Sequence, residues 1–179
     1  MTEVAAFAAW LGGALIVLAD GRRGLALGLT VMTVGLAVLA LAAGQPFGAT
    51  AMLAGGAVAS VLRLRSGPDA WGLMQPGSTP RIILTVAVGL VALWLAASVS
   101  SGDGAPLRFA VLATMVMTAA RILQGGDRAV CLTAASGLAI ALGAGTGITS
   151  GASGPVPYLI AALIAAGISM LPQVEPHGA

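Results

Sequence analysis

Charged residues are scarce in this 179-residue sequence, and lysine is absent altogether. Only 8% of the residues are Asp, Glu, Lys or Arg, whereas 58% are hydrophobic. A soluble globule of this length needs far more polar surface than this composition supplies. The composition therefore excludes a soluble protein and predicts an all-α integral membrane protein.

Histidine and cysteine are almost missing as well. The sequence holds one His, His177, and one Cys, Cys131. A metal or haem site needs several spaced ligands, and a nucleophile needs a nearby base to activate it. We therefore expect no metal ion, no cofactor and no enzymatic activity.

Ionisable residues are also missing from the middle of the apolar segments, where a proton or ion path would need them. The chain by itself is therefore not expected to act as a pump. All eight basic residues are Arg, and they lie in or near the breaks between apolar segments. They form no basic face, so a nucleic-acid partner is not expected.

What the sequence does contain is a series of apolar segments of about the length that crosses a bilayer. Gly44 and Pro46 predict a turn between the second and third segments, and the glycine-rich stretch 143–154 predicts a flexible loop. Residues 63–81 contain three prolines and predict a cytoplasmic loop. The sequence thus predicts a single transmembrane domain, 1–179, with about seven helices over residues 4–19, 24–43, 47–62, 82–99, 106–121, 129–146 and 155–171.

The placement of Arg predicts an orientation. If successive loops alternate between the two sides, seven of the eight Arg fall on one side and Arg108 falls on the other. Basic residues concentrate on the cytoplasmic side of membrane proteins. We therefore expect a multi-pass protein of a bacterial-type inner (cytoplasmic) membrane, with the N-terminus outside and the C-terminus in the cytoplasm. The rings of Phe47, Phe109 and Tyr158 would then lie together at the outer interface.

Two short charged turns, residues 20–23 and 121–128, would lie at the cytoplasmic surface. Their Arg can either anchor the protein to anionic lipid headgroups or dock a neighbouring subunit. The residues expected at such an interface or lipid-anchoring surface are Arg22, Arg23, Arg63, Arg65, Trp71, Arg81, Arg121, Asp127 and Arg128.

Small residues at helical spacing predict close helix packing, and we single out Gly24 and Gly28. Thr and Ser within the segments are expected to bond carbonyls of their own helices. The segments also suggest an internal repeat, because Gly35-Leu-Ala-Val38 and Gly137-Leu-Ala-Ile140 occupy the middle segments of two triplets. The result would be a 3+1+3 parallel repeat.

This layout, with the turn Gln124-Gly-Gly-Asp-Arg128 and the small-residue helix after it, resembles the hydrogenase-4 component E type of subunit. The C-terminal triplet is similar to the small K-type subunit of complex I and to the matching subunit of multisubunit (Mrp-type) cation/proton antiporters. Those relatives generally carry membrane carboxylates beside the turn, whereas this chain has Leu132-Thr-Ala-Ala-Ser-Gly137.

The resemblance implies a non-catalytic structural subunit of a larger energy-converting or respiratory-type membrane complex, packed against larger, charged membrane subunits. Two other functions stay open. The chain can be a small solute carrier or channel built on the parallel repeat, with a site of Thr, Ser and backbone groups. It can also be a membrane assembly or anchoring factor that binds a partner through residues 63–81.

Overall fold

The computed structural model describes residues 1–66, 71–72, 79–99, 104–125, 127–149 and 154–171. Within these ranges the chain forms seven helices. Their bounds are α1 Thr2–Leu18, α2 Arg22–Ala42, α3 Pro46–Arg65, α4 Thr79–Val99, α5 Ala105–Leu123, α6 Arg128–Thr149 and α7 Val156–Ser169. Each helix coincides with one of the predicted segments, so the all-helical fold is confirmed.

Four of the described helices are long and apolar enough to cross a membrane. They are α2, α3, α5 and the 128–146 part of α6, while α1, the 79–95 part of α4 and α7 are shorter apolar helices. A multi-pass membrane protein is therefore supported by length and composition.

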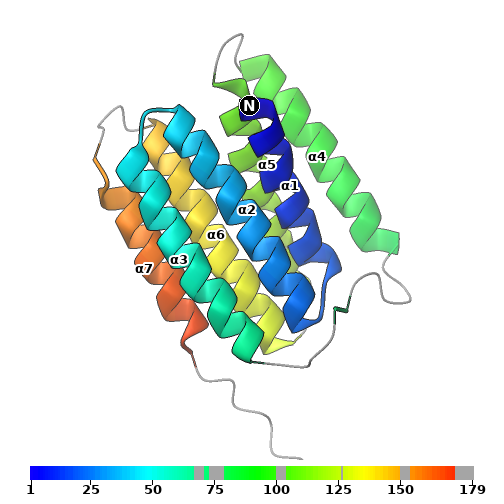
Figure 1. The fold of residues 1–179 in the computed structure, drawn as a ribbon. Helices are drawn as coiled ribbons and strands as arrows, with labels where there is room; N and C mark the ends of the chain where they lie inside the picture. Colours follow the sequence, from blue (N-terminus) through cyan, green and yellow to red (C-terminus); the bar gives the residue numbers. More distant parts are fainter. Residues whose placement is uncertain (67–70, 73–78, 100–103, 126, 150–153, 172–179) are drawn as a thin grey trace, which may run out of the picture.

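The helices form two layers of three with one helix at the edge. Neighbours along the chain pack side by side as α1–α2–α3 and as α5–α6–α7. The layers then meet in matching pairs, because α1 packs on α5, α2 on α6 and α3 on α7. Helix α4 lies outside this pattern, beside α1 and α5 (Figure 1).

Glycines allow α1 and α2 to approach each other closely. A Cβ on Gly12 would lie 2.2 Å from the Met32 nitrogen, and a Cβ on Gly35 would lie 2.5 Å from the Ala9 nitrogen. The structure places Gly28 in the same contact, where a Cβ would lie 2.9 Å from the Gly12 oxygen. Gly24 is buried about one turn earlier in α2. In lipid, such close backbone approach strengthens the van der Waals contact between helices.

Hydroxyl groups inside the bundle mostly bond their own helices, as expected. Thr33, Thr114, Thr118 and Thr133 each donate to the carbonyl four residues earlier. This pattern satisfies buried hydroxyls without a partner helix.

Two hydroxyls also reach a neighbouring helix, and they occupy matching places in the two layers. Thr30 of α2 donates to Ser60 of α3 at 3.0 Å, and Ser136 of α6 contacts Ser169 of α7 at 3.1 Å. Thr30 and Ser136 each follow the first residue of their helix by about two turns. When Thr30 is aligned with Ser136, the two layers are shifted by about one helical turn relative to the alignment of Gly35 with Gly137.

The connections confirm one predicted turn and correct a predicted loop. Gly44 has φ +77°, and the Gln45 N–H donates to the Ala40 carbonyl, so α2 ends in a Schellman motif before Pro46. The loop predicted from Gly143 is wrong for residues 143–149, which continue α6. Gly143 serves packing there, because a Cβ would lie 2.4 Å from the Ala161 Cβ. The remaining residues 150–153 of that stretch lie outside the described ranges.

The predicted loop 63–81 is also shorter than expected, because α3 continues to Arg65 and α4 begins at Thr79.

The position of Tyr158 also differs from the one expected from the sequence. Its ring is buried, and a Cβ on Gly48 would lie 2.6 Å from it, so Gly48 makes room for the ring inside the bundle. Tyr158 therefore does not face headgroups, whereas Phe47 is 76% exposed near the same end of α3.

Candidate functional site

A network of charged residues lies at one end of the bundle. At this end α1, α3 and α5 finish and α2, α4 and α6 begin (Figure 1). Asp20 lies at its centre. Arg81 of α4 donates Nη1 to Asp20 Oδ2 at 2.8 Å, and Arg121 of α5 donates Nη2 to Asp20 Oδ1. One carboxylate therefore joins the ends of three helices.

Arg121 is buried and only partly hydrogen-bonded in this network. The Arg121 side chain is 1% exposed, and its Nε has no hydrogen-bond partner among the described residues. A guanidinium can form two parallel bonds to one carboxylate, but here Arg121 contacts Oδ1 of Asp20 and Arg81 contacts Oδ2. The geometry thus gives each Arg one oxygen of Asp20.

The backbone of residues 71–72 closes over the turn between α1 and α2. The Asp20 N–H donates to the Gly72 carbonyl at 3.1 Å. Gly72 has φ +56°, and a Cβ there would lie 2.3 Å from the Gly21 nitrogen. Only glycine fits this conformation and this space, so the contact depends on Gly72.

Arg63 is the second buried cation at this end. Its residue surface is 3% exposed, and both Nε and Nη1 have no hydrogen-bond partner in the described part of the chain. Asp127, just before α6, is an acidic residue at the same end of the bundle. Arg63 is therefore a buried cation with two hydrogen-bonding positions unused among the described residues.

The structure brings most of the residues predicted at the interface to this same end, but not all of them to its surface. Trp71, Arg23, Arg65, Asp127 and Arg128 are exposed. Arg22 and Arg81 are half-buried. Arg63 and Arg121 are buried inside the bundle, so the expectation that they face lipid headgroups or a neighbouring subunit is wrong in this structure. Arg121 turns inward to the carboxylate of Asp20.

Asp20 and Gly72 are the residues of this network that were not predicted as site residues. Asp20 carries a recognisable signal, because it is one of only six acidic residues and directly follows an apolar segment. Gly72 carries no such signal among 26 glycines. Its importance depends on which turn lies against it in the folded chain.

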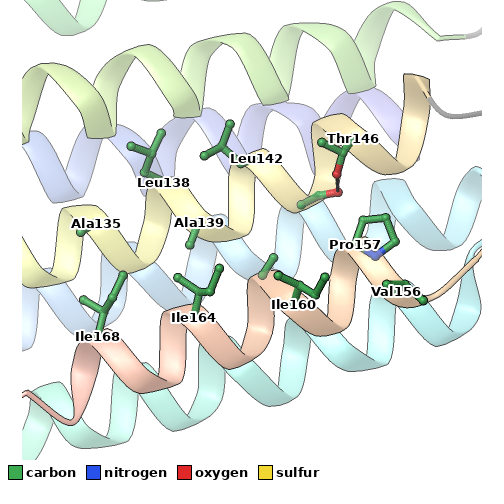
Figure 2. A pocket seen from close by; sticks show the side chains of 12 residues that line it. Ala135, Leu138, Ala139, Leu142, Thr146, Val156, Pro157, Ile160, Ile164 and Ile168 are labelled. Carbon is green, nitrogen blue, oxygen red and sulfur yellow. Dashed lines mark hydrogen bonds between the residues drawn. The ribbon is translucent and has the colours of Figure 1, made fainter.

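An apolar groove runs along α6 and α7. Figure 2 shows Leu138 and Leu142 from α6 and Ile160, Ile164 and Ile168 from α7 along it. The groove has a volume of about 600 Å³, and Ala135, Ala139 and Gly143 supply small side chains along α6. The Thr146 hydroxyl at one end donates to the Gly143 carbonyl at 3.1 Å, so it presents no unused donor to the groove. A second, smaller apolar groove of about 200 Å³ lies between α4 and α5.

Comparison with protein-family models, curated proteins and solved structures finds no match to this chain. The function is therefore inferred from the charged end network, the apolar grooves and the resemblance in layout.

Proposed function

We propose that all seven helices span a membrane, with the charged end network on the cytoplasmic side and the N-terminus outside. Seven of the eight Arg belong to the end where α1, α3 and α5 finish, which agrees with the usual cytoplasmic excess of Arg. Helix α7 has 14 residues and a length of about 21 Å, less than the hydrocarbon thickness of about 30 Å. A short span of this kind is accommodated by local thinning of the bilayer.

Within that membrane, the chain acts as a non-catalytic structural subunit of a larger energy-converting or respiratory-type complex. The groove between α6 and α7 is the observation that carries this proposal. It opens on the side of the bundle, and the exposed fractions of Leu142, Ile160 and Ile164 are 44%, 52% and 47%. Small residues between ridges of Leu and Ile allow a helix of a partner subunit to approach closely.

The placement of polar groups supports a role without catalysis. The buried hydroxyls of Thr33, Thr114, Thr118 and Thr133 are bonded to their own helices. The buried Arg lie at one end of the bundle and not at its middle. A path for protons needs ionisable groups along the membrane depth, so larger subunits would supply it.

A small solute carrier is the second candidate, because matching helices of the two layers pack against each other as α1 on α5, α2 on α6 and α3 on α7. Transporters often use repeats of this parallel kind.

The third candidate, an assembly or anchoring factor, would use Trp71, which is 51% exposed beside the turn between α1 and α2.

The test is co-purification from native membranes in mild detergent. In the double variant Leu142→Trp with Ile164→Trp, the two new side chains fill the groove. The matched control is Leu90→Trp on α4, where the Leu90 side chain is 62% exposed. We expect wild type and the control to retain stoichiometric membrane subunits and the groove variant to lose them. Equal retention by all three proteins would contradict the groove as the interface. Solute transport by the purified chain alone would favour the carrier.

A further inference from the structure

Helix α4 packs closely on the bundle near its beginning. Leu84 and Val88 of α4 belong to a small apolar cluster with Met117 of α5. About one turn before Leu84, Arg81 is bonded to Asp20. An ion pair and apolar packing therefore hold this part of α4 against its neighbours.

Further along α4, an apolar groove lies between this helix and α5. Its volume is about 200 Å³, and its lining includes Val91 and Leu95 of α4 and Leu112 and Val116 of α5. Val91 and Val116 are 55% and 48% exposed, so the groove opens on the side of the bundle. Side chains that line an unfilled gap lose van der Waals contacts, so a flexible apolar group that fills the groove is stabilising.

The size and lining of this groove select its occupant. It has about a third of the volume of the groove between α6 and α7. An α-helix with its side chains is about 10 to 12 Å wide, so the smaller groove is too small to receive a helix of a partner protein. The described residues that line it are Ala, Val and Leu, so no side chain there bonds a polar ligand. A single hydrocarbon chain is narrow and apolar, and it meets both conditions.

Arg108 places a positive charge beyond one end of the groove. Leu112 and Val116 follow Arg108 at intervals of four residues, so the three residues lie on one face of α5. The guanidinium of Arg108 extends toward the start of this helix, because its Nη2 is 3.7 Å from the position of a Cβ on Gly104. The cation therefore lies along the same face as the groove, at the end of the bundle opposite the charged end network.

The spacing along α5 matches the dimensions of a phospholipid. At a rise of about 1.5 Å per residue, Leu112 and Val116 lie about 12 and 18 Å from Gly104 along the helix axis. One leaflet contributes about 15 Å to a hydrocarbon thickness of about 30 Å. When the guanidinium is at the depth of the phosphates, the groove is therefore at the depth of the acyl chains, near the middle of the bilayer.

We propose that the groove between α4 and α5 binds one acyl chain of a phospholipid whose phosphate lies at Arg108. Arg108 also interacts within the chain, but a guanidinium has five N–H donors and can contact a phosphate oxygen as well. Since apolar burial contributes little within hydrocarbon, binding depends on van der Waals contact in the groove and on the attraction between phosphate and guanidinium. The proposal rests on the proposed membrane placement of the helices and needs no partner subunit.

The first experiment locates the lipid on the wild-type protein. A phosphatidylglycerol with a photoreactive group in the middle of one acyl chain is incorporated into vesicles that contain the protein, and the vesicles are irradiated. We expect the cross-links to concentrate on the parts of α4 and α5 around Val91 and Leu112. Cross-links spread evenly over the exposed faces of the helices would overturn the proposal. Failure of the wild-type protein to insert into vesicles would instead contradict the membrane placement.

The second experiment counts the retained lipid by native mass spectrometry from detergent micelles that contain phosphatidylglycerol. Val91→Trp fills the groove. Leu93→Trp is the matched control, because Leu93 is 56% exposed on α4 and lies outside the groove lining. Wild type and Leu93→Trp should each retain one more phosphatidylglycerol per chain than Val91→Trp. Equal retention by Val91→Trp and wild type would contradict the groove as the binding site.

The same assay tests the contribution of Arg108. Arg108→Gln should need about fivefold more phosphatidylglycerol for equal occupancy, because the attraction between the phosphate and a nearby cation is lost. Arg65→Gln removes an exposed Arg at the opposite end of the bundle and should bind as wild type does. Equal weakening by both variants would show only a general attraction of anionic lipid and would overturn the assignment of the phosphate to Arg108. Unchanged binding by Arg108→Gln would overturn it too.

Discussion

Arg121 donates its Nη2 to Oδ1 of Asp20, a residue 101 positions earlier in the chain. This pair joins the end of α5 to the end of α1, and Arg81 adds the start of α4 through the other carboxylate oxygen. The contact explains how α4, which lies at the edge of the bundle, is held at the charged end network.

Asp20→Asn should destabilise the protein by about 1 to 3 kcal/mol, because it leaves a buried guanidinium without its anionic acceptor. Arg121→Lys should also lower the melting temperature, since Arg121 is buried in the bundle. Arg128→Lys should be nearly silent, because Arg128 is exposed and either cation suits a surface position. Thermal melting in detergent checks these values. Equal stability of Asp20→Asn and wild type would contradict the pairing of Arg121 with Asp20.

Arg81→Gln should be milder than Arg121→Gln. The Arg81 side chain is 30% exposed, whereas that of Arg121 is 1% exposed, so water replaces the lost contact of Arg81 more easily. Both Arg contact the same carboxylate, so their effects on stability should be coupled. A double-mutant cycle on Arg81 and Arg121 measures this coupling. Strictly additive losses would show that the two Arg do not act together through Asp20.

Gly12→Ala should destabilise the bundle by about 1 to 3 kcal/mol, because the new Cβ would overlap the backbone of α2 at Met32. Gly167→Ala in α7 is the matched control. A Cβ at Gly167 meets nothing within 4 Å, so this helix should gain up to about 1 kcal/mol from the better helix former. Melting of both proteins under one condition checks the difference, and a neutral Gly12→Ala would mean that α1 and α2 lie further apart.

Cysteines at opposite ends of the bundle should be labelled from opposite sides of the membrane. In a Cys131→Ala background, Cys at Gln124 should react only with reagents that enter the cytoplasm, and Cys at Phe47 should react from outside. Both positions are exposed, at the Arg-rich end and at the other end respectively. Labelling of both sites from one side would contradict the alternation of spans, and exchanged accessibility would reverse the orientation.

The sequence by itself determined the helical fold and the approximate limits of the helices. Long apolar segments broken by Gly, Pro and charged residues leave few alternatives, because backbone polar groups in hydrocarbon must be satisfied within each segment. The same alternation placed seven Arg at one end of the bundle. These features follow from local composition and need no knowledge of which helices touch.

Tertiary structure decided which of those charged residues face inward. Arg63 and Arg65 are close in sequence and alike in chemistry, yet one is buried and the other exposed. An α-helix turns by about 100° per residue, so the side chains of Arg63 and Arg65 lie on different faces of α3. Which face of α3 is covered depends on its packing against α2, α6 and α7.

The network around Asp20 also depends on tertiary structure. The network forms only if α1 and α5 end where α4 begins. It also requires residues 71–72 to pack on the turn at Gly21. The groove between α6 and α7 arises in the same way, because both helices are largely apolar and their neighbours leave this side uncovered. Apolar composition cannot distinguish a face buried within the chain from one left open to lipid or to a partner, because both require the same side chains.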